Sequence, residues 1–439
     1  MSRVLAIMLV AAFACGLAGN ATAMPEIEHW TTANGARVYF VAAPEIPMID
    51  ARVVFAAGSA RDDGQPGLAE LTNDLLREGA GERDADAFSS ALGATGARLS
   101  NGSLRDMAYV GVRTLAEPRY ADPALVLLAD AIARPRFDAA AVDRIKGRAL
   151  VALRHREQSP ESIAEDTFYR EIYGDHPYAS PPDGTADSVT ALGRDDVVAF
   201  HRRYYVARNA VIAIVGDLDR ARAAAIAEQL SVGLAAGERA AALPAPAATS
   251  AHELRVEYPS IQSHVRVGLP GMRRGDPDYF PLLVGNHALG GNALVSILFR
   301  EIRNKRGLSY SASSYFVPMA AEGPFVALLQ TDRSQEPEAL AVLRETLGGF
   351  IADGPPAADL EAAKQNLIGG FPLRIDSNDK IVEYIAMIGF YDLPLDYLEQ
   401  FTRQVAAVTA EDVRDAFARR VPLDGLVTVI VGRAEADEG

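Results

Sequence analysis

The strongest constraint on the fold is an internal repeat that relates the middle of the chain to its end. Residues 196–216 and 412–432 carry the same features in the same order, at a constant offset of 216 positions and without a gap. Each segment opens with acidic residues that begin a predicted helix and ends in a β-branched run that stops at glycine. Upstream, residues 159–161 and 376–378 interrupt helical patterns at comparable positions. We therefore expect two copies of one domain design rather than a chance similarity of two helix–strand units.

A segment rich in alanine and proline separates the two copies. Residues 234–251 contain Leu243-Pro244-Ala245-Pro246-Ala247, a composition typical of a semi-extended linker. The chain has 439 residues, about three times the ~150 residues of one domain. We therefore predict an N-terminal domain over residues 24–233, this linker, and a C-terminal domain over residues 252–439.

The expected fold class is α+β. Strand-like runs such as residues 51–55 and 263–268 open the two halves, and helical patterns such as residues 125–133 and 339–351 follow them. The strands and long helices do not alternate strictly as βαβ units. This pattern favours two homologous α/β-layered domains over a doubly wound parallel sheet.

The first 23 residues have the pattern of a secretory signal peptide. Arg3 precedes an apolar run over residues 4–17, and small residues end in Ala21-Thr22-Ala23, so we expect cleavage before Met24. The apolar run is too short to span a bilayer, and no later run reaches about 18 apolar residues. We therefore expect an exported, periplasmic protein without a transmembrane segment. Cys15 follows a poor context for lipid acylation, so we do not expect a lipoprotein.

Composition and motif searches argue against several classes of function. The net charge of −15 argues against a nucleic-acid-binding protein, which needs a basic face to replace phosphate counterions. The single cysteine allows neither an intrachain disulfide nor a cysteine zinc site, and no two of the seven histidines are spaced i, i+4. The chain also has no G-x-S-x-G elbow, no P-loop and no G-x-G-x-x-G after a strand.

One segment of the N-terminal half nevertheless resembles a known family. Residues 58–69, Gly-Ser-Ala-Arg-Asp-Asp-Gly-Gln-Pro-Gly-Leu-Ala, look like the segment before the catalytic helix of the pitrilysin-type zinc peptidases. This family includes the mitochondrial processing peptidases and the insulin-degrading enzymes. In its active members the next residues are H-x-x-E-H, in which two histidines bind Zn²⁺ and the glutamate is the general base.

The residues at this motif depart from the active pattern. Glu70 and Asp74 stand where the two histidines would be, and Asn73 stands where the base would be. An amide cannot take a proton from water near neutral pH. The resemblance also implies a third ligand, a glutamate on a helix that here spans about residues 143–156. Residues 144–156 contain no acid but five Arg or Lys. We therefore expect no metal ligand, no catalytic residue and no zinc in this chain.

A second signature lies in the C-terminal half. Residues 289–311 resemble the family's C-terminal-domain signature, which runs from a glycine-rich turn through a helix to R-G-L-x-Y. In the family, the Arg and Tyr of this pattern help to hold the substrate between the two halves. The resemblance therefore implies that Arg306 and Tyr310 bind peptide. From residue types alone, Arg306 could instead cap a helix and Tyr310 could pack in a strand.

The resemblance covers nearly all of the predicted mature chain and implies a function. Short bacterial members resemble half of the long clamshell enzymes, and some work as heterodimers of a zinc-bearing subunit and a metal-free subunit with the Arg/Tyr pair. This chain looks like the metal-free subunit, whose partner supplies H-x-x-E-H and zinc, and whose ligand is a peptide substrate. A structural or scaffold protein without a role in proteolysis is the alternative. A self-sufficient peptidase with an unconventional site is a third hypothesis.

Overall fold

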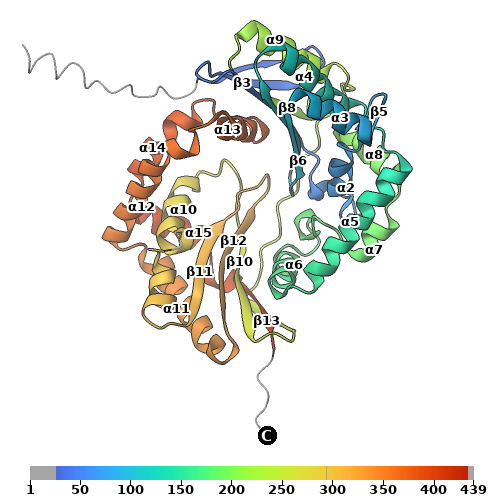
Figure 1. The fold of residues 1–439 in the computed structure, drawn as a ribbon. Coiled ribbons are helices and arrows are strands. Elements are labelled where there is room, and N and C mark those ends of the chain that lie inside the picture. The colour runs from blue at the N-terminus through green and yellow to red at the C-terminus, as the bar shows by residue number, and fades with distance from the viewer. Residues whose placement is uncertain (1–25, 293, 434–439) are drawn as a thin grey trace, which may run out of the picture.

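The computed structural model describes residues 26–292 and 294–433, and it contains two large sheets with similar strand orders (Figure 1). The predicted signal peptide and Cys15 lie outside the described residues. The first sheet has the order β1-β2-β8-β3-β7-β6, and the second, read from its far edge, has the order β9-β13-β10-β12-β11. The first sheet consists of β1 (Glu28–Thr31), β2 (Arg37–Ala42), β8 (Ala210–Gly216), β3 (Met48–Phe55), β7 (Ala108–Leu115) and β6 (Arg98–Ser103). The second consists of β9 (His252–Glu257), β13 (Val427–Gly432), β10 (Gln262–Met272), β12 (Gly323–Asp332) and β11 (Ser309–Phe316).

Helices surround the two sheets. In the N-terminal half they are α2 (Leu68–Leu75), α3 (Ala85–Thr95), α4 (Pro118–Ala133), α5 (Ala139–Glu157), α6 (Pro160–Tyr173), α7 (Ala186–Ala191), α8 (Arg194–Tyr204) and α9 (Arg220–Ser231). In the C-terminal half they are α10 (Tyr279–Asn286), α11 (Glu336–Asp353), α12 (Ala357–Gly370), α13 (Asn378–Phe390), α14 (Tyr397–Ala407) and α15 (Ala410–Arg420). Between α9 and β9, residues 234–251 form no helix or strand and run as an extended connection.

The structure confirms the repeat and the α+β class. Both ends of α8 and of α15 are separated by the offset of 216 positions found in the sequence. The carboxylates of Asp196 and Asp412 accept a hydrogen bond from the N-cap N–H of Gly193 (2.8 Å) and Thr409 (2.9 Å), which is why acidic residues begin both helices. The strands that follow, β8 and β13, each pair in parallel on one side and antiparallel on the other.

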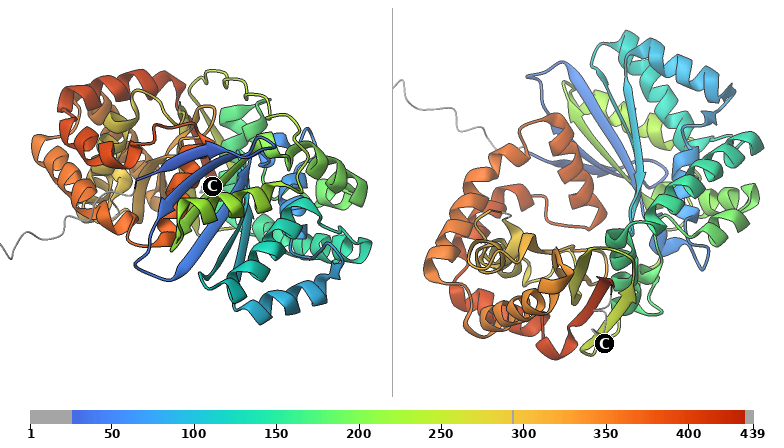
Figure 2. Two further views of the ribbon diagram at one scale, coloured as in Figure 1. Left: turned by 90° about the horizontal axis from the view of Figure 1, so that it is seen from above. Right: turned by 60° about the horizontal axis from the view of Figure 1, so that its bottom comes forward.

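The two halves exchange one helix each. Helix α6 belongs to the N-terminal half by sequence but packs on β10 and β13 of the second sheet, and α13 packs on β3 and β8 of the first sheet (Figures 1 and 2). Ser159 and Ser377 are the N-caps of these helices, and their hydroxyls accept a backbone N–H three residues on. The interruptions at residues 159–161 and 376–378 are therefore the starts of the exchanged helices.

The hydrophobic core follows this exchange. One core cluster unites Val54, Val211 and Val215 of the first sheet with Ile385 of α13 and with the residues between the second sheet and its own helices. A smaller cluster joins Phe168 of α6 to Val429 of β13. The packing therefore crosses the predicted boundary between residues 233 and 252, and the placement of that boundary stays a prediction. No helix among the described residues combines the length and the apolarity needed to cross a membrane.

Candidate functional site

Helix α2, which carries the altered motif, begins at a glycine and a buried carboxylate. Gly67 is the N-cap residue with φ of 91°, a conformation that glycine adopts at little cost. The Asp62 carboxylate accepts hydrogen bonds from the backbone N–H of Gly67 (2.9 Å) and Ala69 (2.8 Å). Burial raises the pKa of Asp62 to about 7 even though these bonds favour the charged form. Within the segment 58–69, which resembles the family, Asp62 and Gly67 thus determine where α2 begins.

Two carboxyl groups stand one helical turn apart on α2. Burial, and next the charge of Asp74, raise the pKa of Glu70 to about 8. Glu70 is therefore largely protonated near neutral pH, and a protonated carboxyl group is a poor ligand for a cation. Because Glu70 is neutral, the two residues at the histidine positions do not present a pair of carboxylates to a cation.

Asn73, at the position of the general base, is fully buried and hydrogen-bonded. Its side chain donates to the Tyr109 carbonyl (3.2 Å) and the Tyr205 hydroxyl (3.4 Å), and its Oδ1 accepts from Asn101 (2.8 Å). Both ends of the amide are occupied by neighbours on β6, on β7 and at the end of α8. Asn73 therefore holds α2 against the sheet, and its amide has no exposed surface from which to orient a water molecule.

The stretch of α5 at the predicted third-ligand position is bound to an acid of its own. Arg144 and Arg148 both pair with Glu78, at 2.9 Å for Arg148. Together with Asp74 they line a polar hollow of about 590 Å³ between α2, α3, α5 and β6. Glu78 was not among the residues singled out from the sequence, although five basic residues in one helix are a signal that counter-charges lie nearby.

These donors do not fit a catalytic zinc ion. Zinc in peptidases takes imidazole and carboxylate ligands around an open position. Here α2 presents a protonated Glu70 and a buried amide, and α5 presents two arginines. Among residues 26–292 and 294–433, no three His, Cys, Asp or Glu side chains are grouped so that they could hold a metal ion. The side chains at the motif positions are instead engaged in the packing of α2 against the sheet.

The second signature forms an irregular helix that ends at Gly307. Residues 299–304 are a π-helical turn, η5, and the N–H of Gly307 donates to the Arg303 carbonyl. Gly307 has φ of 67°, which is the usual conformation of the residue that closes a helix. The N–H of the buried Leu308 then donates to the Ile302 carbonyl (3.0 Å). The R-G-L part of the signature is thus a helix end, as the resemblance implied, and the turn before it is π-helical.

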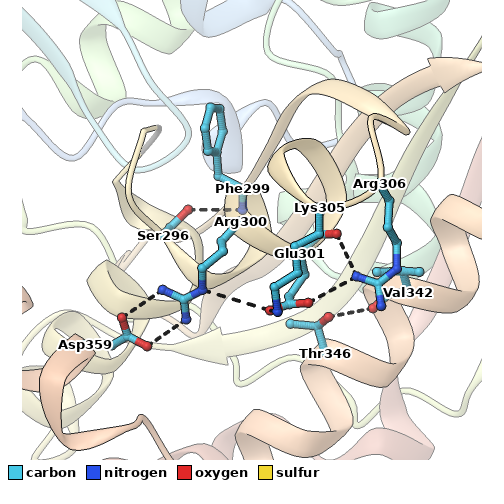
Figure 3. Close-up of polar contacts among 9 residues, drawn as sticks. All are labelled: Ser296, Phe299, Arg300, Glu301, Lys305, Arg306, Val342, Thr346 and Asp359. Carbon is cyan, nitrogen blue, oxygen red and sulfur yellow. Dashed lines mark hydrogen bonds and ion pairs between the residues drawn. The ribbon is translucent and has the colours of Figure 1, made fainter.

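Arg306 is held by the π-helical turn that precedes it, η5. Its Nη1 donates to the Glu301 carbonyl (2.8 Å) and pairs with the Glu301 carboxylate (3.1 Å), which also binds Lys305 (Figure 3). The side chain is 36% exposed and lines a hollow of about 420 Å³ beside α11. The structure gives Arg306 a capping role and leaves part of its guanidinium open to solvent.

Tyr310 lies at the beginning of β11, an edge strand, and is 85% exposed. Arg303 donates to its backbone carbonyl (3.2 Å) and stands 5.8 Å from its ring. In the part of the chain that the structure describes, no hydrogen bond or ion pair joins Tyr310 to Arg306. The two residues are close in sequence but face different neighbours, and their role in binding peptide stays a prediction.

Comparisons with known proteins agree on one family. Residues 37–185 match the insulinase model of peptidase family M16, and residues 191–367 match the peptidase M16 inactive domain. The crystal structure of a peptidase M16 inactive domain from Pseudomonas fluorescens is 38% identical, with a TM-score of 0.90, over 93% of this chain and 98% of that one. An uncharacterized zinc protease of Streptomyces coelicolor is 28% identical over 81% of this chain and 78% of its own length. A protein of Helicobacter pylori described as a non-peptidase homologue is 25% identical over 87% of this chain and 88% of its own length.

Proposed function

Because the chain belongs to peptidase family M16 as a non-catalytic member, we propose that it is the substrate-binding subunit of an exported heterodimeric metallopeptidase. The partner is a relative with H-x-x-E-H, which supplies zinc and the attacking water. This chain closes the chamber and contributes Arg306 and Tyr310 to a bound peptide.

One observation carries the proposal. The amide of Asn73 is buried, and its nitrogen and its oxygen are both hydrogen-bonded, at the position where an active member needs a base. The rest of the fold retains both sheets and the R-G-L-x-Y segment with an exposed Tyr310. The chain thus keeps the two-sheet fold and an exposed segment that an extended peptide could contact, but it has no catalytic base. This combination suits a binding subunit.

The first test concerns the purified chain alone. It should carry no stoichiometric zinc and cleave no peptide, because the motif positions offer a protonated carboxyl group and an amide. Elemental analysis after dialysis and a peptidase assay measure both properties. One zinc ion per chain together with chelator-sensitive proteolysis contradicts the proposal.

The second test uses the reconstituted pair. The zinc-bearing subunit is mixed with chains that carry Arg306→Ala or Tyr310→Phe. Formation of the heterodimer is verified before activity is measured. Loss of a charge-assisted bond is expected to lower kcat/KM about ten- to a hundredfold. Lys305→Ala is the matched control, because Lys305 binds the same Glu301 and is exposed. If both variants match the control, this chain does not hold the substrate through these residues.

A structural role is the second candidate function. In the part of the chain that the structure describes, both hydrogen bonds of Arg306 go to Glu301, in the π-helical turn just before it, and such a residue can be kept for the fold alone. In that case the reconstituted pair keeps its kcat/KM in both variants, whereas Arg306→Ala lowers the melting temperature. Export is tested separately, by fractionating the native host and measuring whether the mature N-terminus is Met24.

A further inference from the structure

The connection between the two halves is the longest stretch of the described chain that forms neither a helix nor a strand. It runs from the end of α9 to the beginning of β9. Within it, Leu243, Pro246 and Thr249 are partly buried, whereas the residues between them are exposed. Burial of every third residue matches the period of a polyproline II helix, which is extended and has no internal hydrogen bonds. Residues 243–249, the strap, therefore lie extended along the surface.

The strap is hydrogen-bonded to the rest of the protein near its two ends. The His176 side chain donates to the Pro244 carbonyl (2.9 Å), and the Thr249 hydroxyl donates to the Gly425 carbonyl (2.5 Å). Between these points, three exposed residues form no backbone hydrogen bond within the described ranges: Ala245, Ala247 and Ala248. Their N–H and carbonyl groups are therefore free to pair with the main chain of another protein.

These features match what an endopeptidase requires of a folded substrate. Nicking of folded proteins concentrates in exposed segments with small residues, and alanine fits the small S1 pocket of an elastase-type enzyme. The bonds before Pro244 and Pro246 resist cleavage, because proline has no N–H and its ring crowds the scissile bond. Of the bonds between small residues that remain, Ala247–Ala248 is not held directly, whereas the next one involves Thr249, which is bound to Gly425.

We propose that the Ala247–Ala248 bond is a site of limited proteolysis by an endopeptidase with a small S1 pocket, and that the cut chain stays folded as one body. Hydrolysis adds one water molecule across the amide, breaks its C–N bond, and leaves a carboxylate on Ala247 and an ammonium on Ala248. Both new ends lie beside a hollow of about 230 Å³ whose lining includes Glu322, Arg419 and Arg420. This inference rests on the strap and on the packing between the halves, and not on the proposed function.

The packing between the halves does not depend on the strap. A cut after Ala247 leaves α6 in the first fragment and its sheet partners β10 and β13 in the second. The same cut leaves α13 in the second fragment, packed on β3 and β8 of the first. Separation of the fragments exposes the clusters that contain Val54 with Ile385 and Phe168 with Val429. Exposure of this buried apolar surface to water opposes dissociation.

The experiment is limited proteolysis of the purified full chain with elastase, followed by mass spectrometry of the fragments. The first cut within residues 26–433 should fall at Ala247–Ala248. The two fragments should elute together from a size-exclusion column at the volume of the uncut chain, and separate in urea. Thermal unfolding of the cut protein should stay cooperative, with a midpoint that rises with protein concentration, because two pieces must now associate. A first cut elsewhere, or fragments that separate without urea, overturns the proposal.

Variants test the assigned bond. Ala248→Pro places proline after the scissile bond and should abolish the cut there. Ala242→Pro is the matched control, because it stiffens another exposed alanine of the connection and should leave the cut unchanged. If Ala248→Pro does not fold, Ala247→Arg should lose the elastase cut and gain a trypsin cut at the same bond, because the acidic S1 pocket of trypsin accepts arginine. An elastase cut that persists in Ala248→Pro, or no new trypsin cut in Ala247→Arg, contradicts the assignment.

Discussion

Glu70 lies on α2 with most of its carboxyl group away from water and the charge of Asp74 one helical turn away. Both conditions disfavour the charged form, and the pKa of Glu70 is raised from 4.5 to about 8. In an active member the same position is a metal ligand. Here the residue is a half-buried acid that takes up a proton on folding.

This proton uptake makes stability depend on pH. In the unfolded chain the pKa of Glu70 is near 4.5, and in the folded chain it is about 8. Between these values the folded state binds more protons, so the free energy of unfolding falls as pH rises from about 4.5 to about 8. Glu70→Gln removes this part of the slope, and the variant should gain stability relative to the native chain at pH 8. Urea unfolding at pH 5, 6.5 and 8 measures the slopes.

Asp62 acts in the same direction, because its pKa is raised from 3.8 to about 7. Some decline in stability with rising pH should therefore remain in the Glu70→Gln variant. If the variant and the native chain lose the same free energy of unfolding between pH 5 and pH 8, Glu70 does not take up a proton on folding.

At the scale of elements, α2 and α5 together decide whether the motif can be restored. The triple variant Glu70→His, Asn73→Glu and Asp74→His recreates H-x-x-E-H on α2, but Arg144 and Arg148 stay on α5 at the third-ligand position. We expect no stoichiometric zinc after dialysis, because three ligands are needed and the arginines oppose a dication. The substitution Asn73→Glu also places a carboxylate at a site with no exposed surface, which should destabilise the fold by about 1–3 kcal/mol.

A matched variant separates metal binding from folding in this experiment. Glu70→His with Asp74→His keeps Asn73 and its hydrogen bonds, so it should fold better than the triple variant. Elemental analysis and thermal unfolding of both proteins give the comparison. Tight zinc binding by either one indicates that a third ligand lies elsewhere than on α5.

The exchanged helix α13 depends on a close approach to the first sheet. A Cβ at the buried Gly389 would lie 2.5 Å from the Tyr39 ring and 2.7 Å from Val211. Gly389→Ala should therefore push α13 away from the sheet and destabilise the protein by about 1–3 kcal/mol. Gly369→Ala on α12 is the control, because a Cβ there meets no atom within 4 Å, and it should stabilise by about 0.5–1 kcal/mol. Urea unfolding measures the change in the free energy of unfolding for each variant. Equal changes for the two substitutions contradict the close approach of α13 to the first sheet.

At the scale of the whole molecule, a buried carboxylate at the β6–β7 turn joins the two halves. Asp106 is 5% exposed and accepts hydrogen bonds from the hydroxyls of Tyr178 and Tyr391 and from the N–H of Ala320 (2.7 Å). The Tyr178 hydroxyl in turn accepts from the N–H of Ala321 (3.0 Å). The turn of one sheet is thus fixed to the turn before β12 of the other and to the end of α13.

Replacing Asp106 by Asn should loosen this junction. The amide offers one acceptor in place of two, so a tyrosine or a backbone N–H loses its partner, at a cost of about 1–3 kcal/mol. Hydrogen exchange should accelerate around residues 319–322 and 391, while the sheet centres stay protected. Asp63→Asn, which affects an exposed pair with Arg203, should change stability by less than about 1 kcal/mol. Unchanged exchange at residues 319–322 in Asp106→Asn removes Asp106 from this role.

Much of the chain's organisation follows from its sequence. The repeat, the α+β class, the start of α8 and α15 at acidic residues, and the altered motif are local patterns. They depend on residue order over one or two elements, and the family comparisons confirm the resemblance that these patterns suggested. The absence of a base at Asn73 also follows from residue type alone, since no environment makes an amide basic near neutral pH.

The tertiary structure decided which surfaces meet. An apolar stripe on α6 or α13 predicts burial but does not say which sheet covers it, because helical periodicity carries no information about a partner far away in the chain. The same limit hid the pairing of Arg144 and Arg148 with Glu78 and the hydrogen bonds that Asp106 accepts from Tyr178 and Tyr391. Charge and burial at these sites arise only when distant segments pack against each other. The sequence alone therefore determined the repeated fold and the absence of a catalytic base, and the tertiary packing determined which charged and polar side chains meet.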